Sequence, residues 1–282
     1  MPFAVVTDST AYLPEGFADR HAVHVVPLTV HIDDESGRDG VDIGPDELAR
    51  ALRDHRTVTT SRPNPEAFAV RYRALLASGY EGVVSVHLSR DLSGTWESAR
   101  LAADEVDPTR IHVVDSRTIA MGLGFAALRA ASVAAAGGTG AEVEAAAVAA
   151  AARTRCLFVV ETLEYLRRGG RIGAAAALFG TALSVKPVLH VADGRIQPLE
   201  KVRTTTRALS RLVDLASAAV AELPSGEVRM AVHHLGAPER AADLAARVDE
   251  RLPASAGCFV SEVGAVIGAH TGPGVLGIAI CT

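Results

Sequence analysis

The residues best placed for chemistry are Ser93, Gly94 and Thr95, which follow an apolar run at residues 83–87 and a short turn. Residues 96–106 have helical spacing, so Ser93 is predicted to be the N-cap of a helix. A strand that leads through a turn into a helix aims unpaired backbone N–H groups at one point, and these groups favour an anion. The stretch alone is also typical of an ordinary capped helix without a ligand.

Other polar turns follow predicted strands, which is where ligands bind in open α/β sheets. They are Thr7-Asp8-Ser9-Thr10, Asp115-Ser116, Glu161-Thr162 and the loop around His270. Taken singly, each of these turns is also typical of an ordinary turn that binds no ligand. Their shared placement predicts a crevice lined with hydroxyl groups.

Four further residues could complete an anion site. Thr60 and Ser61 lie in a proline-bounded polar loop at residues 57–65 and can donate hydroxyl hydrogens. Arg171, between glycines, and His270, before a Gly-Pro-Gly turn, can supply positive charge. A solvated helix-terminal arginine and a packed histidine that caps a turn are the structural alternatives.

The sequence gives weaker support to three other kinds of site. A serine hydrolase would use Ser93, His270 and an aspartate such as Asp115, but no serine lies in a G-x-S-x-G nucleophile elbow. A Rossmann-type enzyme should carry G-x-G-x-x-G after its first strand, where residues 7–10 read TDST. The pair His233-His234 is a weak metal site because adjacent strand residues point to opposite faces.

Composition narrows the class of protein. The 282 residues are 49% hydrophobic with a net charge of −5, which allows a large core and disfavours a nucleic-acid partner. The N-terminus lacks the basic region of a signal peptide, and Arg129 and Lys186-Pro187 interrupt the longest apolar stretches. Three widely spaced cysteines in or beside apolar runs fit reduced thiols, so we expect a cytoplasmic protein.

Alternating strand and helix patterns predict an α/β fold with a largely parallel sheet in the N-terminal domain, residues 1–153, and a second α/β domain, residues 154–282. The predicted strands are 3–6, 23–30, 83–87, 110–114, 156–160, 187–191, 228–233, 259–263 and 275–280. The predicted helices are 46–53, 66–77, 96–106, 119–136, 141–153, 162–168, 174–183, 205–223 and 238–252.

These stretches together resemble the DegV family, bacterial fatty-acid-binding proteins that form the lipid-carrying subunit of fatty acid kinase. The matching pieces, in family order over nearly the whole chain, are VTDSTAYLP, TTSRPNPEAF, LSRDLSGTWESA, VVDSRTIAMGLG, ETLEYLRRGGRIG, SVKPVL, PLEKVRT and EVGAVIGAHTGPGVLG. Arg62 replaces a usual glutamine and Trp96 replaces a common tyrosine or phenylalanine, which affects local contacts alone.

The resemblance implies a two-domain fold with one long-chain fatty acid between the domains and its tail in an apolar tunnel. A separate ATP-dependent kinase would phosphorylate the carboxylate to an acyl phosphate for phospholipid synthesis. This subunit would present the acid without being an enzyme itself and would need no cofactor or metal. Expected partners are the fatty acid and the kinase, with no nucleic acid and at most transient contact with a membrane.

The resemblance also implies roles for individual residues, which the two predicted domains would share. The N-terminal domain would supply the carboxylate-binding loops, and the C-terminal domain Arg171 and His270. The carboxylate is expected at Thr60, Ser61, Ser93, Gly94, Thr95, Arg171 and His270. Candidate tunnel walls are Met121, Phe125, Phe179 and Leu183.

A basic run supplies the last prediction. Lys201, Arg203 and Arg207 lie at the predicted N-terminus of a helix, where the helix dipole disfavours cations. We therefore predict that they dock an acidic surface of the kinase, with a solvated turn as the alternative. Lys186 is predicted to be structural and to support the strand that starts at Pro187.

Overall fold

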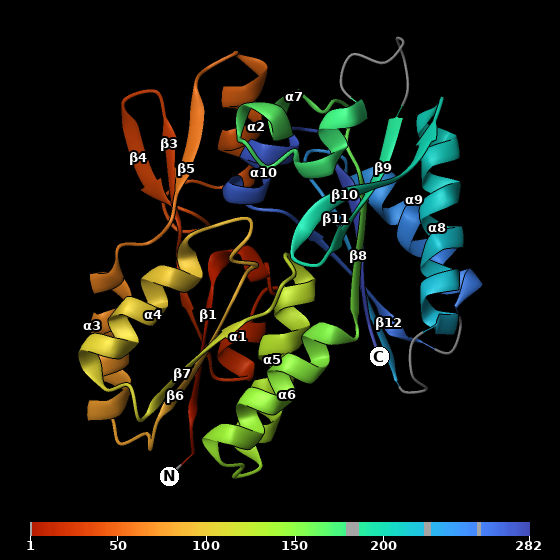
Figure 1. Ribbon diagram of the computed structural model, residues 1–282. Coiled ribbons are helices and arrows are strands. Elements are labelled where there is room, and N and C mark those ends of the chain that lie inside the picture. Colours follow the sequence, from red (N-terminus) through yellow and green to blue (C-terminus); the bar gives the residue numbers. More distant parts are fainter. Residues whose placement is uncertain (1, 179–185, 223–226, 253–254) are drawn as a thin grey trace.

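The computed structural model describes residues 2–178, 186–222, 227–252 and 255–282 as a mixed α/β protein with three sheets (Figure 1). The first sheet is parallel with strand order β2-β1-β6-β7, as predicted for this part of the chain. Its strands are β1 (Ala4–Asp8), β2 (Val23–Val26), β6 (Val83–His87) and β7 (Ile111–Asp115). Every residue of β1 and β6 is buried, including the polar residues Thr7, Asp8, Ser85 and His87.

Helices cover both faces of this parallel sheet. Alternate residues of a strand point to opposite faces, so Val6 packs with α3 and α4, and Val5 packs with α5 and α6. The four helices are α3 (Pro65–Ala77), α4 (Thr95–Val106), α5 (Met121–Ala135) and α6 (Gly140–Ala152). Each lies within a few residues of its predicted range.

A small antiparallel sheet with order β4-β3-β5 was not predicted. Its strands are β3 (Thr29–Ile32), β4 (Glu35–Arg38) and β5 (Val58–Ser61), and short helices α1 (Phe17–Arg20), α2 (Pro45–Arg53) and η1 (Ser9–Ala11) lie nearby in the chain. The single strand predicted at 23–30 is therefore wrong: it divides at Pro27, which lacks an N–H, into strands of different sheets. The predicted polar loop 57–65 likewise contains β5.

The third sheet has order β10-β9-β8-β13-β11-β12 and is antiparallel except for the pair β11–β12. Its strands are β8 (Thr154–Val159), β9 (Lys186–Ala192), β10 (Arg195–Val202), β11 (Val228–His234), β12 (Ser255–Glu262) and β13 (Leu276–Cys281). Helices α8 (Thr205–Glu222) and α9 (Pro238–Arg251) cover one face. Strand β10 was not predicted.

Part of the opposite face of the third sheet packs against α5, and the rest faces the small antiparallel sheet. Helices α7 (Glu164–Arg168) and α10 (Ala265–Thr271) and the 3-10 helix η2 (Gly173–Leu178) lie between them, and α10 packs against α2, α7 and β5 (Figure 1). One hydrophobic cluster accordingly joins Leu28 and Leu48 with Phe158, Leu189 and Ile267. The first two sheets use residues before 116 and the third begins at 154, but the proposed division into two domains remains a prediction.

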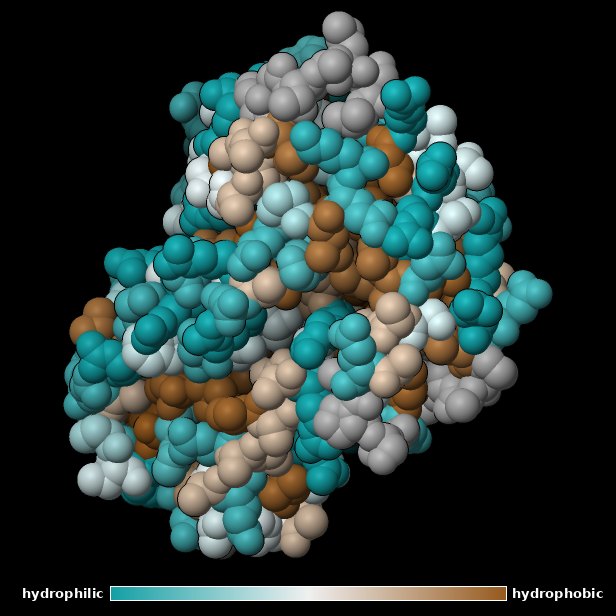
Figure 2. Space-filling view, turned by 45° about the vertical axis from the view of Figure 1, so that its right-hand side comes forward, coloured by the Kyte–Doolittle hydropathy of each residue, from teal (hydrophilic) through white to brown (hydrophobic). Residues whose placement is uncertain are grey.

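Within the described ranges, no helix is both long and apolar enough to cross a membrane. The face in Figure 2 is mostly hydrophilic, with hydrophobic residues in small groups and in a recess near the middle of the view. Most large apolar side chains belong to four buried clusters, whereas Val41, Val70, Leu101, Val148, Leu199 and Val260 are exposed.

Candidate functional site

A cavity lies where the small antiparallel sheet and the β6–α4 turn face the third sheet. The space that it encloses, including the part open to solvent, is about 920 Å³. Most of its wall is apolar and comes from both halves of the chain. The apolar lining residues include Leu28, Leu88, Leu92, Ile119, Phe158, Leu166, Ile196, Val263, Val266, Ile267, Val275 and Ile278.

A set of polar side chains lines the same cavity, and we call it the polar cluster: Thr60, Ser61, Ser93, Arg171 and His270. Thr60 and Ser61 lie in β5, and Ser93 lies in the turn between β6 and α4. Arg171 lies in the loop that follows α7, and His270 lies in α10. These are five of the seven residues predicted for the carboxylate. The structure thus brings together around one cavity residues that lie as far apart in the sequence as Thr60 and His270.

His270 lies in the last turn of α10 rather than in the loop that was predicted. Its Nε2 atom forms a hydrogen bond with Thr60 Oγ1 at 2.9 Å. The Nδ1 atom is buried and has no hydrogen-bond partner in the described structure. Burial, and secondly the charge of Arg171, lowers the pKa of His270 to about 4, so the ring is neutral at pH 7.

Arg171 connects the two sides of the cavity. Its Nε donates to the carbonyl of Leu92 at 3.0 Å, and its Nη1 donates to the carbonyl of Gly169 at 2.5 Å. Both acceptors are neutral, and no described carboxylate lies within salt-bridge distance of this guanidinium. A half-buried cation without an acidic partner favours an anionic ligand beside it.

The prediction that Ser93 caps a helix is wrong. Helix α4 begins at Thr95, its N-cap is Gly94, and no side chain caps it. The Ser93 hydroxyl instead bonds the Thr95 hydroxyl at 2.9 Å and lines the cavity. Gly94 and Thr95 are absent from the cavity lining, and a Cβ on Gly94 would lie 2.4 Å from Arg62 Nη1, so this glycine makes room for an arginine.

The predicted tunnel walls do not match the cavity. Met121 belongs to the core between α5 and the parallel sheet, and Phe125 lines a separate groove with Phe17 and Phe259. Phe179 and Leu183 lie outside the described residues. The apolar walls come instead largely from β8, α10 and β13, whose strands looked in the sequence like ordinary core.

The hydrolase alternative is not supported. His270 bonds Thr60 rather than Ser93, and Asp115 lines a different depression, where it accepts from the backbone N–H groups of Arg90 and Arg117. No group of histidine, cysteine, aspartate and glutamate side chains suited to a metal ion occurs within the described ranges. His233 and His234, both in β11, therefore belong to no such group.

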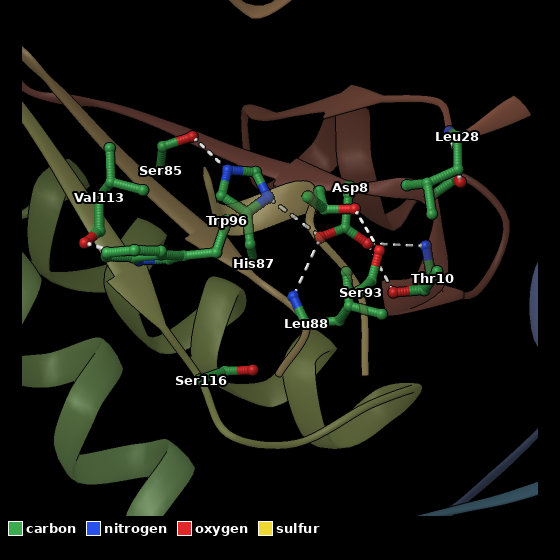
Figure 3. Close-up of polar contacts among 12 residues, drawn as sticks. Asp8, Thr10, Leu28, Ser85, His87, Leu88, Ser93, Trp96, Val113 and Ser116 are labelled. Carbon is green, nitrogen blue, oxygen red and sulfur yellow. Dashed lines mark hydrogen bonds and ion pairs between the residues drawn. The ribbon is translucent and has the colours of Figure 1, made fainter. Parts of the chain in front are cut away.

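A different histidine does have triad-like spacing, in what we call the closed network: Asp8, Thr10, Tyr72, Ser85 and His87. Figure 3 labels four of them, Asp8, Thr10, Ser85 and His87. His87 Nδ1 lies 3.0 Å from Asp8 Oδ2, and His87 Nε2 lies 2.7 Å from Ser85 Oγ. All five side chains are fully buried and none lines the cavity. Without access to a substrate, these contacts are structural.

The basic run lies on the surface. Lys201 is in β10, Arg203 follows that strand, and Arg207 is in the first turn of α8; all three are exposed. Lys186 is the first residue of β9 and pairs with Glu161, which also accepts from Arg240 at 2.9 Å. This ion-paired lysine fits the structural role predicted for it.

Comparison with known proteins agrees with this architecture. Residues 2–282 match the family described as "Uncharacterised protein, DegV family". A DegV domain-containing protein of Streptomyces coelicolor, SCO2569, is 55% identical over 277 residues, which cover 98% of this chain and 97% of that protein.

Comparison with solved structures also identifies proteins of this family. A fatty-acid-binding DegV family protein from Thermus thermophilus is 36% identical, with a TM-score of 0.91 and full coverage of both chains. A stearic-acid-binding protein from Eubacterium ventriosum is 26% identical, with a TM-score of 0.91 over 99% of this chain and 98% of that chain. The chain therefore belongs to the DegV family.

Proposed function

We propose that the chain binds one long-chain fatty acid, saturated or monounsaturated, with its carboxylate at the polar cluster and its tail along the apolar part of the cavity. The observation that carries this proposal is the pairing of a largely apolar cavity with Arg171, a cation that has no acidic partner among the described residues. The fatty acids bound by the Thermus and Eubacterium proteins support the same ligand class.

The two parts of the ligand would contribute differently to binding. Burial of a methylene contributes about 0.8 kcal/mol, so the tail supplies most of the gross affinity. The carboxylate needs hydrogen bonds to offset its loss of water. The hydroxyls of Thr60, Ser61 and Ser93 and the guanidinium groups of Arg62 and Arg171 belong to residues that line the cavity and are candidates for this role.

Mass spectrometry of the intact protein tests this ligand. Protein purified without added lipid should carry one fatty acid per chain, and delipidated protein should take up one palmitate or oleate. A spectrum of unliganded protein that stays unchanged during titration with both acids would contradict the proposal.

We further propose that the protein presents the bound carboxylate to a separate ATP-dependent kinase, which converts it to an acyl phosphate in the cytoplasm. The family resemblance supports this role, and the three free thiols fit a reducing compartment. The subunit would need no cofactor of its own. Its contribution to the reaction would be to bind and orient the acid.

The exposed Lys201, Arg203 and Arg207 are the proposed docking surface for the kinase. Rim charges of this kind chiefly raise the association rate and make it sensitive to salt. Arg203→Glu combined with Arg207→Glu should preserve lipid uptake but weaken kinase coupling and reduce its salt dependence. Arg100→Glu, an exposed arginine on α4, is the control. Unchanged coupling across salt concentrations would eliminate this surface.

A further inference from the structure

Helix α10 carries His270 in its last turn but has no capping side chain of its own, because its N-cap is Gly264. Its first backbone N–H groups donate hydrogen bonds to side chains from the N-terminal part of the chain. Asp39 Oδ1 accepts from Ala265 N at 2.8 Å and from Val266 N at 3.4 Å, and the Tyr12 hydroxyl accepts from Ile267 N at 3.1 Å. Residues more than 220 positions away therefore cap this helix.

These acceptors belong to a partly buried set that we call the capping cluster: Ser9, Tyr12 and Asp39. Ser9 Oγ donates to Asp39 Oδ2 at 2.8 Å, and the Tyr12 hydroxyl lies 3.3 Å from the same oxygen. Asp39 is 2% exposed, and no cationic side chain in the described structure pairs with it. The N-terminus of α10, where backbone N–H groups and the helix dipole favour negative charge, is the compensating partner of this carboxylate.

The contact between α10 and the capping cluster is too close for a larger residue at the N-cap. A Cβ on Gly264 would lie 2.5 Å from Tyr12 Cε1 and 2.7 Å from Asp39 Oδ1. The other end of α10 is equally constrained, since a Cβ on Gly169 would lie 2.0 Å from His270 Nδ1. The helix has seven residues, so a shift of its first turn moves His270 as well.

We propose that Asp39, together with Tyr12, is a positioning residue that fixes α10 along its axis and thereby holds His270 against Thr60 at the cavity. Asp39 does not line the cavity, so its action is through the helix. The expected effect on lipid binding rests on the proposed function, whereas the expected effect on the position of His270 does not.

The test compares Asp39→Ala and Tyr12→Phe with Asp42→Ala, a control aspartate three residues further on that is exposed and paired with Arg38. The side-chain ¹⁵N signals of His270, assigned by comparison with His270→Asn, report its hydrogen bond in delipidated protein. Titrations with palmitate and with 1-hexadecanol, which has the same tail and a neutral head, report the carboxylate and the tail separately.

We expect the His270 signals to move in Asp39→Ala and Tyr12→Phe but not in Asp42→Ala. We also expect palmitate affinity to fall at least about fivefold in the first two while hexadecanol affinity stays within about twofold. If Asp39→Ala does not fold, Tyr12→Phe decides. Unchanged His270 signals in folded variants would overturn the proposal. Wild-type protein that binds neither lipid would refute the proposed function and leave the ¹⁵N test valid.

Discussion

The closed network around Asp8 and the polar cluster around His270 use similar side chains but differ in what remains unsatisfied. Asp8 accepts from Thr10 N, the Thr10 hydroxyl and Leu88 N, and also bonds His87, while Tyr72 donates to Ser85 at 2.8 Å. In the polar cluster, His270 Nδ1 has no partner in the described structure and Arg171 contacts neutral carbonyls.

Whether polar groups are left without partners therefore distinguishes a candidate binding site from a structural network better than residue type or spacing does. The Asp8–His87–Ser85 distances resemble those of a catalytic triad, yet every member is fully buried and bonded within the network. Buried polar groups that are fully satisfied rigidify a core, whereas groups left unsatisfied at a cavity are free to bind a ligand.

The largest effect is expected on stability, from Asp8→Ala, which removes the central acceptor of the closed network. Removal of the carboxylate leaves His87, Leu88 N and Thr10 without their shared acceptor. We expect the free energy of unfolding, measured in urea, to fall by about 3–5 kcal/mol. Asp104→Ala, an exposed aspartate paired with Arg100, should change it little. A loss below about 1 kcal/mol would show that the network is not cooperative.

The next effect concerns pH and His270. In the folded protein the pKa of His270 is lowered from its ordinary value of 6.5 to about 4. Between these two pH values the unfolded state therefore binds more protons at this histidine than the folded state does. Stability should therefore fall as pH is lowered from about 6.5 to about 4, by about 2–3 kcal/mol from this residue. His233, whose pKa burial also lowers to about 4, contributes in the same direction.

His270→Asn should remove its share of that pH dependence, while His233 and the other histidines whose pKa burial lowers, His24, His190 and His234, keep theirs. Urea unfolding of both proteins at several pH values measures the difference. His55→Asn, at an exposed position, is the matched control. Identical pH dependence in wild type and His270→Asn would contradict the assignment of a buried neutral ring.

A smaller effect is expected on ligand affinity from Arg171→Gln. Loss of a charged hydrogen-bond donor should weaken palmitate binding by about 1.5–3 kcal/mol, while hexadecanol binding changes little. Arg168→Gln, an exposed arginine paired with Glu164, is the control. Calorimetric titration with both lipids makes the comparison, and equal losses for the two would place Arg171 at the tail rather than the carboxylate.

The smallest effect is expected from Ser93→Ala, which removes one neutral hydroxyl from the polar cluster. Palmitate binding should weaken by about 0.5–1.5 kcal/mol. Acyl-phosphate formation with a reconstituted kinase should fall by more than binding does, because the head group sets the reaction geometry. Ser78→Ala, whose exposed hydroxyl donates to a helix carbonyl, is the control. Full turnover by Ser93→Ala would remove Ser93 from the head-group site.

The sequence by itself determined most helices and, apart from β2, the strands of the parallel sheet, because these elements depend on local periodicity and composition. The buried strands β1 and β6 and the prolines of the loop that leads into α3 are examples. It also identified the family and five residues that line the cavity, since those residues lie in characteristic motifs.

Tertiary structure alone decided which face of each element meets the cavity. Met121 and Phe158 are both buried apolar residues, yet Phe158 lines the cavity and Met121 does not. The Thr60–His270 bond and the capping of α10 by Asp39 join residues 210 and 226 positions apart. Local periodicity carries no information about such pairs, because they form through the packing of separate sheets.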